Sequence, residues 1–400
     1  MKAYAVAAAM TRFGKYPDQS AAQLGRSLLP GLLRGAGLPP ERVEAVYVGR
    51  SFSGALDGQI AVPGQVALHG TGIQDVPVYN FDNACAAAPS ALSIAAQAVE
   101  AGAIDIALVL GMDKLYHTQR KRSMMALFGA MDVDEMASMG RAIEAAQGDV
   151  GSLFMDHYYA RVARTYMADS GATTRDLARV AVKNRAHASR NPFAQYQRPL
   201  TEDEVLASAL VSQPLRALMC SPLTDGAAAV LVCSERVRKS LPLPAVEISA
   251  SVVLAGRPDR EPGLPPALSR AAAKAFERAG IGPGDLDLVE VHDASAVAEL
   301  VATEELGLAP PGAGVRLLRE GATAIGGRIP VNTSGGLLSR GHPGAATGAS
   351  QLVELVWQLQ GLAGGRQLAN PRFGLACSSG GLIGEEPAAT VVTILKRAGA

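Results

Sequence analysis

Apolar and polar positions along the first hundred residues repeat with alternating strand-like and helix-like periods. The apolar run from Ala3 to Ala9 predicts a strand, the spacing from Ala21 to Leu33 a helix, and the run from Ala45 to Val48 a second strand. A short strand over Val78 to Phe81 then precedes a small-residue helix over Ala91 to Ala101. This order predicts an α/β fold with mostly parallel strands and crossover connections.

The pattern changes over residues 116–205, where methionines, aromatic residues and paired charges replace the apolar strand runs. This stretch predicts an inserted, mostly helical region. Further elements are expected as strands at Ala227–Cys233, Ala245–Leu254 and Leu286–Val291, and as helices at Ala267–Gly280 and Ala345–Gln360. Both halves of the chain follow a similar order of elements, which indicates duplication at the level of the fold.

Composition and charge indicate a folded enzyme that acts on a small molecule. Of the 400 residues, 48% are apolar and 18% charged, which is enough for filled cores and argues against disorder. The 37 basic residues balance the 37 acidic ones, so no net field attracts nucleic acid or an anionic membrane. The apolar N-terminal run is too short to span a membrane, and we interpret it as a strand and not as a signal.

The four cysteines are scattered along the chain. Cys85, Cys220, Cys233 and Cys377 lack the paired spacing of a zinc site or a disulfide framework. We therefore expect reduced thiols, no bound metal and a cytoplasmic protein.

Cys85 is the first candidate for chemistry because it follows the strand that ends at Phe81 and precedes a predicted helix. Unpaired backbone N–H groups and the dipole at a helix start lower the pKa of a thiol. The position therefore predicts a partly ionised nucleophile. For a cysteine taken alone, a small buried thiol among alanines is the alternative.

Two histidines and a second cysteine extend this hypothesis. His342 lies on a glycine-rich turn in SRGHPGAATG and could deprotonate a thiol, or simply end a loop before Pro343. His292 directly follows a predicted strand, where α/β sheets present catalytic groups, although it could equally cap that strand. Cys377 begins CSSGG, whose backbone N–H groups can form a donor nest. The remaining histidines lack such a context and are assigned no role: His69, His117, His157 and His187.

Four motifs in this order resemble the thiolases: NAC around Cys85, HD at His292, GHP at His342 and CSSGG at Cys377. The stretches ARVAVKNRAHASRNPFAQ and SPLTDGAAAVLVCSE also resemble thiolase segments near the end of the first half. The HD pair is similar to that of the sterol-carrier-protein type of thiolase. Four motifs over most of the chain make the resemblance specific.

The resemblance implies a five-layered α-β-α-β-α thiolase fold, built from two similar halves with an inserted loop domain. Residues 1–115, completed by 206–240, would form the first half, 116–205 the loop domain and 241–400 the second half. A homodimer or a dimer of dimers is the expected assembly. The HD-type branch also implies a separate small subunit with an OB fold and a zinc ribbon as a partner.

The resemblance further implies an acyltransferase that cleaves a 3-oxoacyl-CoA with coenzyme A or runs the reverse Claisen condensation. Cys85 would carry the acyl group, and His342 would activate it and polarise a thioester carbonyl. His292 would hold the enolate oxygen, and Cys377 would shuttle a proton at the α-carbon. The backbone N–H groups of Cys85 and Ser379 would form a second oxyanion hole. Coenzyme A is expected as a substrate, and no cofactor is expected to stay bound.

Three positions depart from the family pattern. Sterol-carrier-type thiolases carry a cysteine where this chain has Ala294, which leaves Cys377 as the acid and base. Ser379 stands in place of glycine in the usual Cys-x-Gly pattern. Ala88 and Pro89 replace glycine and a small residue, which predicts an unusually shaped acyl pocket.

Other enzymes of the same fold are the nearest alternatives. A ketoacyl synthase would use Cys-His-Asn or Cys-His-His, and a thiolase-like aldolase would cleave without an acyl-enzyme. The presence of both Cys85 and Cys377 favours thiolase chemistry. A non-catalytic acyl-CoA-binding subunit is the alternative from another class, and retention of all four chemical groups disfavours it.

The inserted region offers candidates for substrate contacts. Its methionine and aromatic residues would line a pocket for a bulky or aromatic acyl chain, or would form core: Met124, Met125, Phe128, Met131, Phe154 and Tyr158. The phosphates of coenzyme A require positive charge, and Arg120, Lys121 and Arg122 are candidates to supply it.

Overall fold

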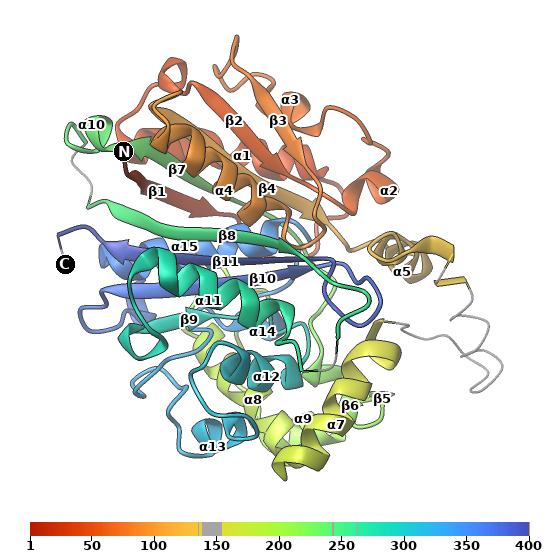
Figure 1. Cartoon of the computed structure of the whole chain (residues 1–400). Coiled ribbons are helices and arrows are strands. Elements are labelled where there is room, and N and C mark those ends of the chain that lie inside the picture. The colour runs from red at the N-terminus through yellow and green to blue at the C-terminus, as the bar shows by residue number, and fades with distance from the viewer. Residues whose placement is uncertain (135, 138–153, 242–243, 262, 400) are drawn as a thin grey trace.

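A nine-stranded sheet organises the computed structural model, which describes residues 1–134, 136–137, 154–241, 244–261 and 263–399. Its strands are β1 (Ala3–Met10), β2 (Ala45–Gly49), β3 (Val78–Phe81), β4 (Ile106–Lys114), β7 (Asp225–Ser234), β8 (Val246–Ala255), β9 (Leu288–Glu290), β10 (Phe373–Gly380) and β11 (Ala389–Arg397). They run in the order β3-β2-β4-β7-β1-β8-β11-β10-β9, as Figure 1 shows. The first-half strands meet the second-half strands where Tyr4 of β1 pairs with Glu247 of β8.

The helices follow the predicted periodicity closely. They are α1 (Ala21–Ala36), α2 (Ser53–Asp57), α3 (Pro63–Leu68), α4 (Ala87–Glu100), α5 (Arg120–Phe128), α7 (Ala160–Ser170), α8 (Thr174–Ala188), α9 (Glu202–Ala207), α10 (Glu235–Arg238), α11 (Ala267–Ala279), α12 (Ala296–Glu305), α13 (Gly314–Arg319), α14 (Gly336–Ser339) and α15 (Ala346–Gln360). Single 3₁₀ turns occupy Pro40–Arg42, Ala217–Met219, Pro283–Asp285 and Gly364–Arg366, and a π-helix occupies Phe154–Tyr159. Local chemistry sets the ends: Ser20 and Gln23 form a capping box at the start of α1, and Gly37 ends it in the left-handed conformation.

The alternation of side chains along each strand produces the layers. On β4, Leu108 faces a core formed with α1, whereas its neighbour Val109 faces a core formed with α4 and α15. On β10, Ala376 faces that same central core and Leu375 faces a core formed with α11. Helices α4 and α15 therefore lie between the two halves of the sheet, with α1 and α11 outside them. The result is the five-layered α-β-α-β-α thiolase fold that the sequence predicts.

The prediction of mostly parallel strands is wrong, because the sheet is mixed. Strands β2 and β3, β2 and β4, and β9 and β10 pair in parallel, whereas β7 is antiparallel to both β4 and β1. Lys114 at the end of β4 lies opposite Asp225 at the start of β7. The chain between these strands therefore leaves and returns at one end of the sheet, which hydrophobic periodicity alone does not reveal.

The region between β4 and β7 is helical in its described part, as expected for residues 116–205. It contains α5, α7, α8 and α9, and between α9 and β7 lies a small hairpin of β5 (Leu210–Ser212) and β6 (Leu215–Arg216). The division into domains stays a prediction. No helix within the described ranges is both long and apolar enough to cross a membrane.

Candidate active site

Cys85 lies in the turn between β3 and α4. The preceding residue, Ala84, has a φ of 48°, a left-handed conformation that is strained for a residue other than glycine. Strand β10 holds this turn from the other half of the chain. The Ser378 hydroxyl donates to the Cys85 carbonyl at 3.1 Å, and a Cβ at Gly380 would lie 2.0 Å from the Asn83 carbonyl oxygen. The nucleophile therefore depends on close contact between the two halves.

The Cys85 thiol is not acidified by the helix start. Burial, with a contribution from the charge of Asp113, raises the pKa of Cys85 above its ordinary value. Helix α4 begins only at Ala87, and its dipole does not offset the loss of solvation. The prediction of a partly ionised thiol is wrong, because desolvation disfavours the thiolate. The thiol therefore requires a base, and Nε2 of His342 lies 3.4 Å from its sulfur.

His342 is held as a neutral imidazole. Burial and then the neighbouring His292 and Arg340 lower the pKa of His342 well below its ordinary value. Its Nδ1 lies 2.7 Å from the hydroxyl oxygen of Thr347, on the first turn of α15. We assign the Nδ1 proton to this hydrogen bond, so that Nε2 presents its lone pair to the Cys85 sulfur.

His292 completes the cluster from the end of β9. Its ring stands edge-on to that of His342, with centroids 5.1 Å apart and an interplanar angle of 83°. Burial, followed by the charge of Arg340, lowers the pKa of His292 to about 4. Within the described chain, its buried Nδ1 has no hydrogen-bond partner. A neutral ring with an unused nitrogen is suited to bind an oxygen atom of a ligand.

One nitrogen from each histidine and the sulfur of Cys85 lie within 4.8 Å of one another. Thiolate and imidazole are also zinc ligands, so among the described residues this trio could hold a metal as well as perform acyl transfer. The expectation that no metal is bound stays a prediction.

Cys377 and Ser379 approach from β10. Burial raises the pKa of the Cys377 thiol to about 12, and a hydrogen bond from the His292 backbone opposes this rise. Both residues line the same cavity as Cys85, His292 and His342. The structure therefore brings together every residue that the sequence nominated for catalysis, while their chemical roles stay predictions.

Asp293 fixes the loop that carries His342, a role that the sequence did not reveal. Its carboxylate accepts hydrogen bonds from the backbone of Leu337 at 2.7 Å and of Leu338 at 3.4 Å, and from the Asn184 amide at 2.8 Å. Gly336 has a φ of 60°, and a Cβ there would lie 2.2 Å from the same carboxylate. The glycine is therefore required by the close approach of Asp293 to α14.

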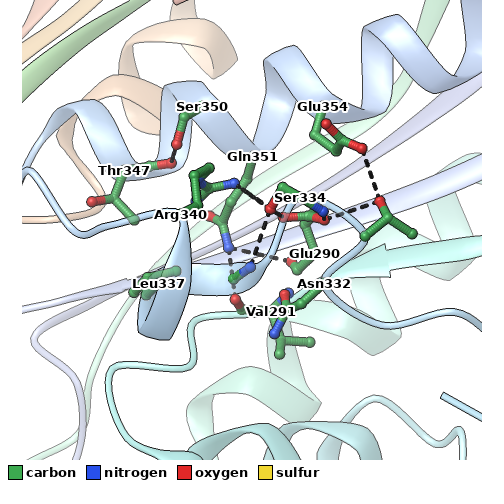
Figure 2. Close-up of polar contacts among 12 residues, drawn as sticks. Glu290, Val291, Asn332, Ser334, Leu337, Arg340, Thr347, Ser350, Gln351 and Glu354 are labelled. Carbon is green, nitrogen blue, oxygen red and sulfur yellow. Dashed lines mark hydrogen bonds and ion pairs between the residues drawn. The ribbon is translucent and has the colours of Figure 1, made fainter. Parts of the chain in front are cut away.

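A second support is a buried ion pair beside the histidines. Figure 2 shows the Arg340 guanidinium directed toward Glu290, at 3.1 Å, and toward the Ser334 hydroxyl, at 2.8 Å. Arg340 and Glu290 are both 0% exposed. The amide nitrogen of Gln351 on α15 donates to the carbonyls of Val291 and Cys377 at 2.9 and 3.0 Å, and thereby ties β9 to β10. The sequence feature that could have indicated this ion pair is Glu290 within an apolar strand, because a buried charge requires a partner.

The catalytic cluster opens into a cavity of about 930 Å³. Polar and basic groups line one part of it: Lys15, Tyr116, His117, Thr118 and Arg120. A face of α12 lines another part, together with residues of α11 and of the segment between β10 and β11. The cavity reaches the upper end of the size that is common for ligand sites.

Only some of the residues proposed to contact the substrate from the inserted region line the cavity. Met124 and Tyr158 line the cavity, and so does Arg120 of the basic run. Five candidates are not among the lining residues: Met125, Phe128, Met131, Lys121 and Arg122. The side chains of Phe154 and His157 lie outside the described part of the structure.

The expectation that Ala88 and Pro89 shape the acyl pocket is wrong. Both are buried in α4 and neither lines the cavity. Ala88 packs against Gly49 and Gly111, and Pro89 packs against Gly348 of α15. These two residues instead set the spacing between the central helices and the sheet.

Comparisons with known proteins agree with the sequence motifs. The family model described as "Thiolase, N-terminal domain" matches residues 3–236, and "Thiolase C-terminal domain-like" matches residues 258–397. An acetyl-CoA acetyltransferase of Methanothermobacter thermautotrophicus is 35% identical, over 94% of this chain and 95% of the relative. The benzoylsuccinyl-CoA thiolase subunit BbsB of Thauera aromatica is 34% identical, over 95% of both chains. Sterol carrier protein 2 of Gallus gallus is 34% identical, over 94% of this chain and 69% of the relative.

Solved structures share the fold. A chain of "Ltp2-ChsH2(DUF35) aldolase" matches with a TM-score of 0.81 and 24% identity, over 99% of this chain and 98% of the other. Human mitochondrial 3-ketoacyl-CoA thiolase matches with a TM-score of 0.72 and 17% identity, over 99% of both chains. At these identities the likeness concerns the fold alone.

Proposed function

The chain belongs to the thiolase family and is an acyltransferase, and from this premise we propose that it transfers acyl groups between carbon and coenzyme A through an acyl-enzyme on Cys85. The substrate is a 3-oxoacyl-CoA in the direction of cleavage. The observation that carries the proposal is the 3.4 Å contact between the Cys85 sulfur and Nε2 of His342. It supplies the base that a buried, un-ionised thiol requires.

Cleavage begins when Nε2 of His342 takes the proton of Cys85 and the thiolate attacks the C3 carbonyl carbon of the substrate. The C2–C3 bond then breaks, the acyl chain stays on Cys85 as a thioester, and the electron pair leaves as the enolate of acetyl-CoA. Cys377 protonates that enolate at C2. The Cys377 thiol lines the same cavity as the nucleophile Cys85, which supports this role.

The second half-reaction returns the enzyme to its starting state. The thiol of coenzyme A gives its proton to the Cys377 thiolate and attacks the acyl thioester. Cys85 leaves as a thiolate and recovers its proton from the imidazolium of His342. The condensation direction reverses each of these steps, and in both directions the acyl group passes between two thioesters, one on Cys85 and one on coenzyme A.

Two sites would stabilise the negative oxygens. The unpartnered, buried nitrogen of His292 supports a role in binding the enolate oxygen together with His342. The backbone N–H groups of Cys85 and Ser379 are proposed to bind the oxygen of the tetrahedral intermediates. Preorganised donors of this kind typically contribute about 3 to 4 kcal/mol each to the barrier.

The small and apolar residues of α12 that line this cavity of about 930 Å³, together with Met124, support a bulky acyl group. The name of the Thauera aromatica relative supports an aromatic one. Lys15 and Arg120 supply positive charge on the polar side, where the phosphates of coenzyme A would enter. We further propose a homodimer and a separate small OB-fold and zinc-ribbon subunit, a partner that fits the word "subunit" in that relative's name.

The test is thiolysis of a panel of 3-oxoacyl-CoA esters, aliphatic and aromatic, with and without added coenzyme A. The proposal predicts two acyl-CoA products only when coenzyme A is present. Cleavage of the matching 3-hydroxyacyl-CoA esters without coenzyme A, with release of a free aldehyde or ketone, and no thiolysis of the 3-oxo esters would indicate aldolase chemistry and overturn the proposal.

A further inference from the structure

Glu305 at the end of α12 is the one charged group on an otherwise small and apolar face of that helix. Ala298, Val301, Ala302 and Glu305 line the cavity at helical positions i, i+3, i+4 and i+7. The rise from Ala298 to Glu305 is about 10 Å, and helical side chains lean back toward the N-terminus. Glu305 therefore lies about 10 Å along the helix axis from Ala298, at the end of α12 opposite to the one that His292 precedes.

The surroundings place this carboxyl group among other residues that line the cavity. Its charge raises the pKa of Tyr158 and of Cys377, after burial in each case. Burial raises the pKa of Glu305 itself to about 7, the charge of Glu386 adds to this rise, and Arg260 opposes it. All five residues line the same cavity, so Glu305 faces the chamber in which the acyl group is bound.

The charged groups beside Glu305 form ion pairs, whereas Glu305 forms none with the described residues. Glu386 pairs with Arg270 at 2.9 Å and with Arg260 at 3.4 Å, and Arg161 pairs with Glu385. Within the described ranges, no side chain hydrogen-bonds to the Glu305 carboxyl group or forms an ion pair with it. The Glu305 oxygens are therefore open to the cavity, where a ligand that donates a hydrogen bond can reach them.

We propose that Glu305 is a specificity-determining residue, which accepts a hydrogen bond from a hydroxyl group at the far end of the substrate's acyl chain. The inference rests on the proposed function, because it names the substrate class of that same site. A neutral donor fits better than an ammonium group, because the charge of Arg260 acts on Glu305 and that of Arg161 acts on Tyr158 beside it. A second carboxylate on the substrate would be repelled by Glu305 and would find both arginines already paired.

The experiment compares kcat/KM for thiolysis of three substrates: 3-oxodecanoyl-CoA, its ω-hydroxy derivative and its ω-carboxy derivative. Wild-type enzyme is expected to prefer the ω-hydroxy substrate over the plain one by about tenfold or more, as sites built for a substrate hydroxyl do. Glu305→Leu should reduce this ratio to one or below. Glu305→Gln should retain a preference, since its amide oxygen still accepts a hydrogen bond.

The control is Glu277→Leu, a change at an exposed glutamate on the neighbouring α11, which should keep the wild-type ratio. A wild-type ratio near one, an unchanged ratio in Glu305→Leu, or a preference for the ω-carboxy substrate would overturn the inference. If 3-oxodecanoyl-CoA is cleaved without such a preference, the proposed function stands and only the role of Glu305 fails. If none of the three is cleaved while another 3-oxoacyl-CoA ester is, the role of Glu305 fails alone; if no ester is cleaved in the presence of coenzyme A, both fail.

Discussion

Replacing Thr347 with valine tests how His342 is held as a base. The hydroxyl of Thr347 lies 2.7 Å from Nδ1 of His342, and Thr347 is 0% exposed. Valine preserves the shape and leaves the Nδ1 hydrogen in a buried place without an acceptor, at a cost of about 1 to 3 kcal/mol. The cost is largest when the ring is protonated, so acylation of Cys85 should slow by about 5- to 150-fold.

The measurement is the single-turnover rate of Cys85 acylation by an acyl-CoA, followed by rapid quenching and intact mass. Thr347→Ser is the matched control, because it restores the hydroxyl and should acylate within about threefold of wild type. An unfolding curve for each variant separates a loss of stability from a loss of rate. Acylation of Thr347→Val at the wild-type rate would refute the assignment of the Nδ1 proton and of Nε2 as the acceptor.

Three further predictions follow from the site and its supports. Cys377→Ala should lose carbon–carbon bond cleavage by about 100-fold or more, whereas acylation of Cys85 by an acyl-CoA should slow by about tenfold at most, because the thiolate of coenzyme A can leave without a proton; a matching loss of acylation would contradict the main role of Cys377 at the α-carbon. Asp293→Ala leaves three buried donors without their acceptor and should lower the free energy of unfolding in urea by about 3 kcal/mol or more; a loss below about 1 kcal/mol would show that Asp293 does not fix the loop. Burial lowers the pKa of His187 to about 3, so its contribution to stability is present above pH 6.5, its unfolded value, and is lost as the pH falls toward 3. Wild type should therefore lose about 2 kcal/mol more than His187→Gln between pH 7 and pH 5. Equal pH slopes would contradict a neutral imidazole that hydrogen-bonds to the Asn332 carbonyl through Nδ1, at 2.9 Å, and to the Ile325 N–H through Nε2, at 3.0 Å.

Hydrophobic periodicity and the sequence motifs predict most of the fold. Val78–Phe81 was predicted as a strand and is one, and the predicted helices near Ala267 and Ala345 begin within one residue of α11 and α15. These elements are specified by local spacing of apolar residues and by glycines at their ends. Strand direction was missed at β7, because it depends on where the inserted region returns to the sheet.

The site was predictable only as far as its motifs reach. Cys85, His342, His292 and Cys377 lie together, but the raised pKa of Cys85 arises from burial by segments that are distant in sequence. The partner of Glu290 is Arg340, fifty positions away, and spacing does not identify such a pair. The sequence likewise did not indicate a role for Asp293, because the groups that donate hydrogen bonds to its carboxylate lie on α14 and α8, far away in the chain.

The central claim is that Cys85 carries the acyl group, and intact mass tests it most directly. Wild-type protein mixed with acetyl-CoA is expected to gain one acetyl group, which added coenzyme A removes, and Cys85→Ser should gain none. An adduct of the same size and lability in Cys85→Ser, or no adduct in wild type with any acyl donor, would contradict the covalent mechanism.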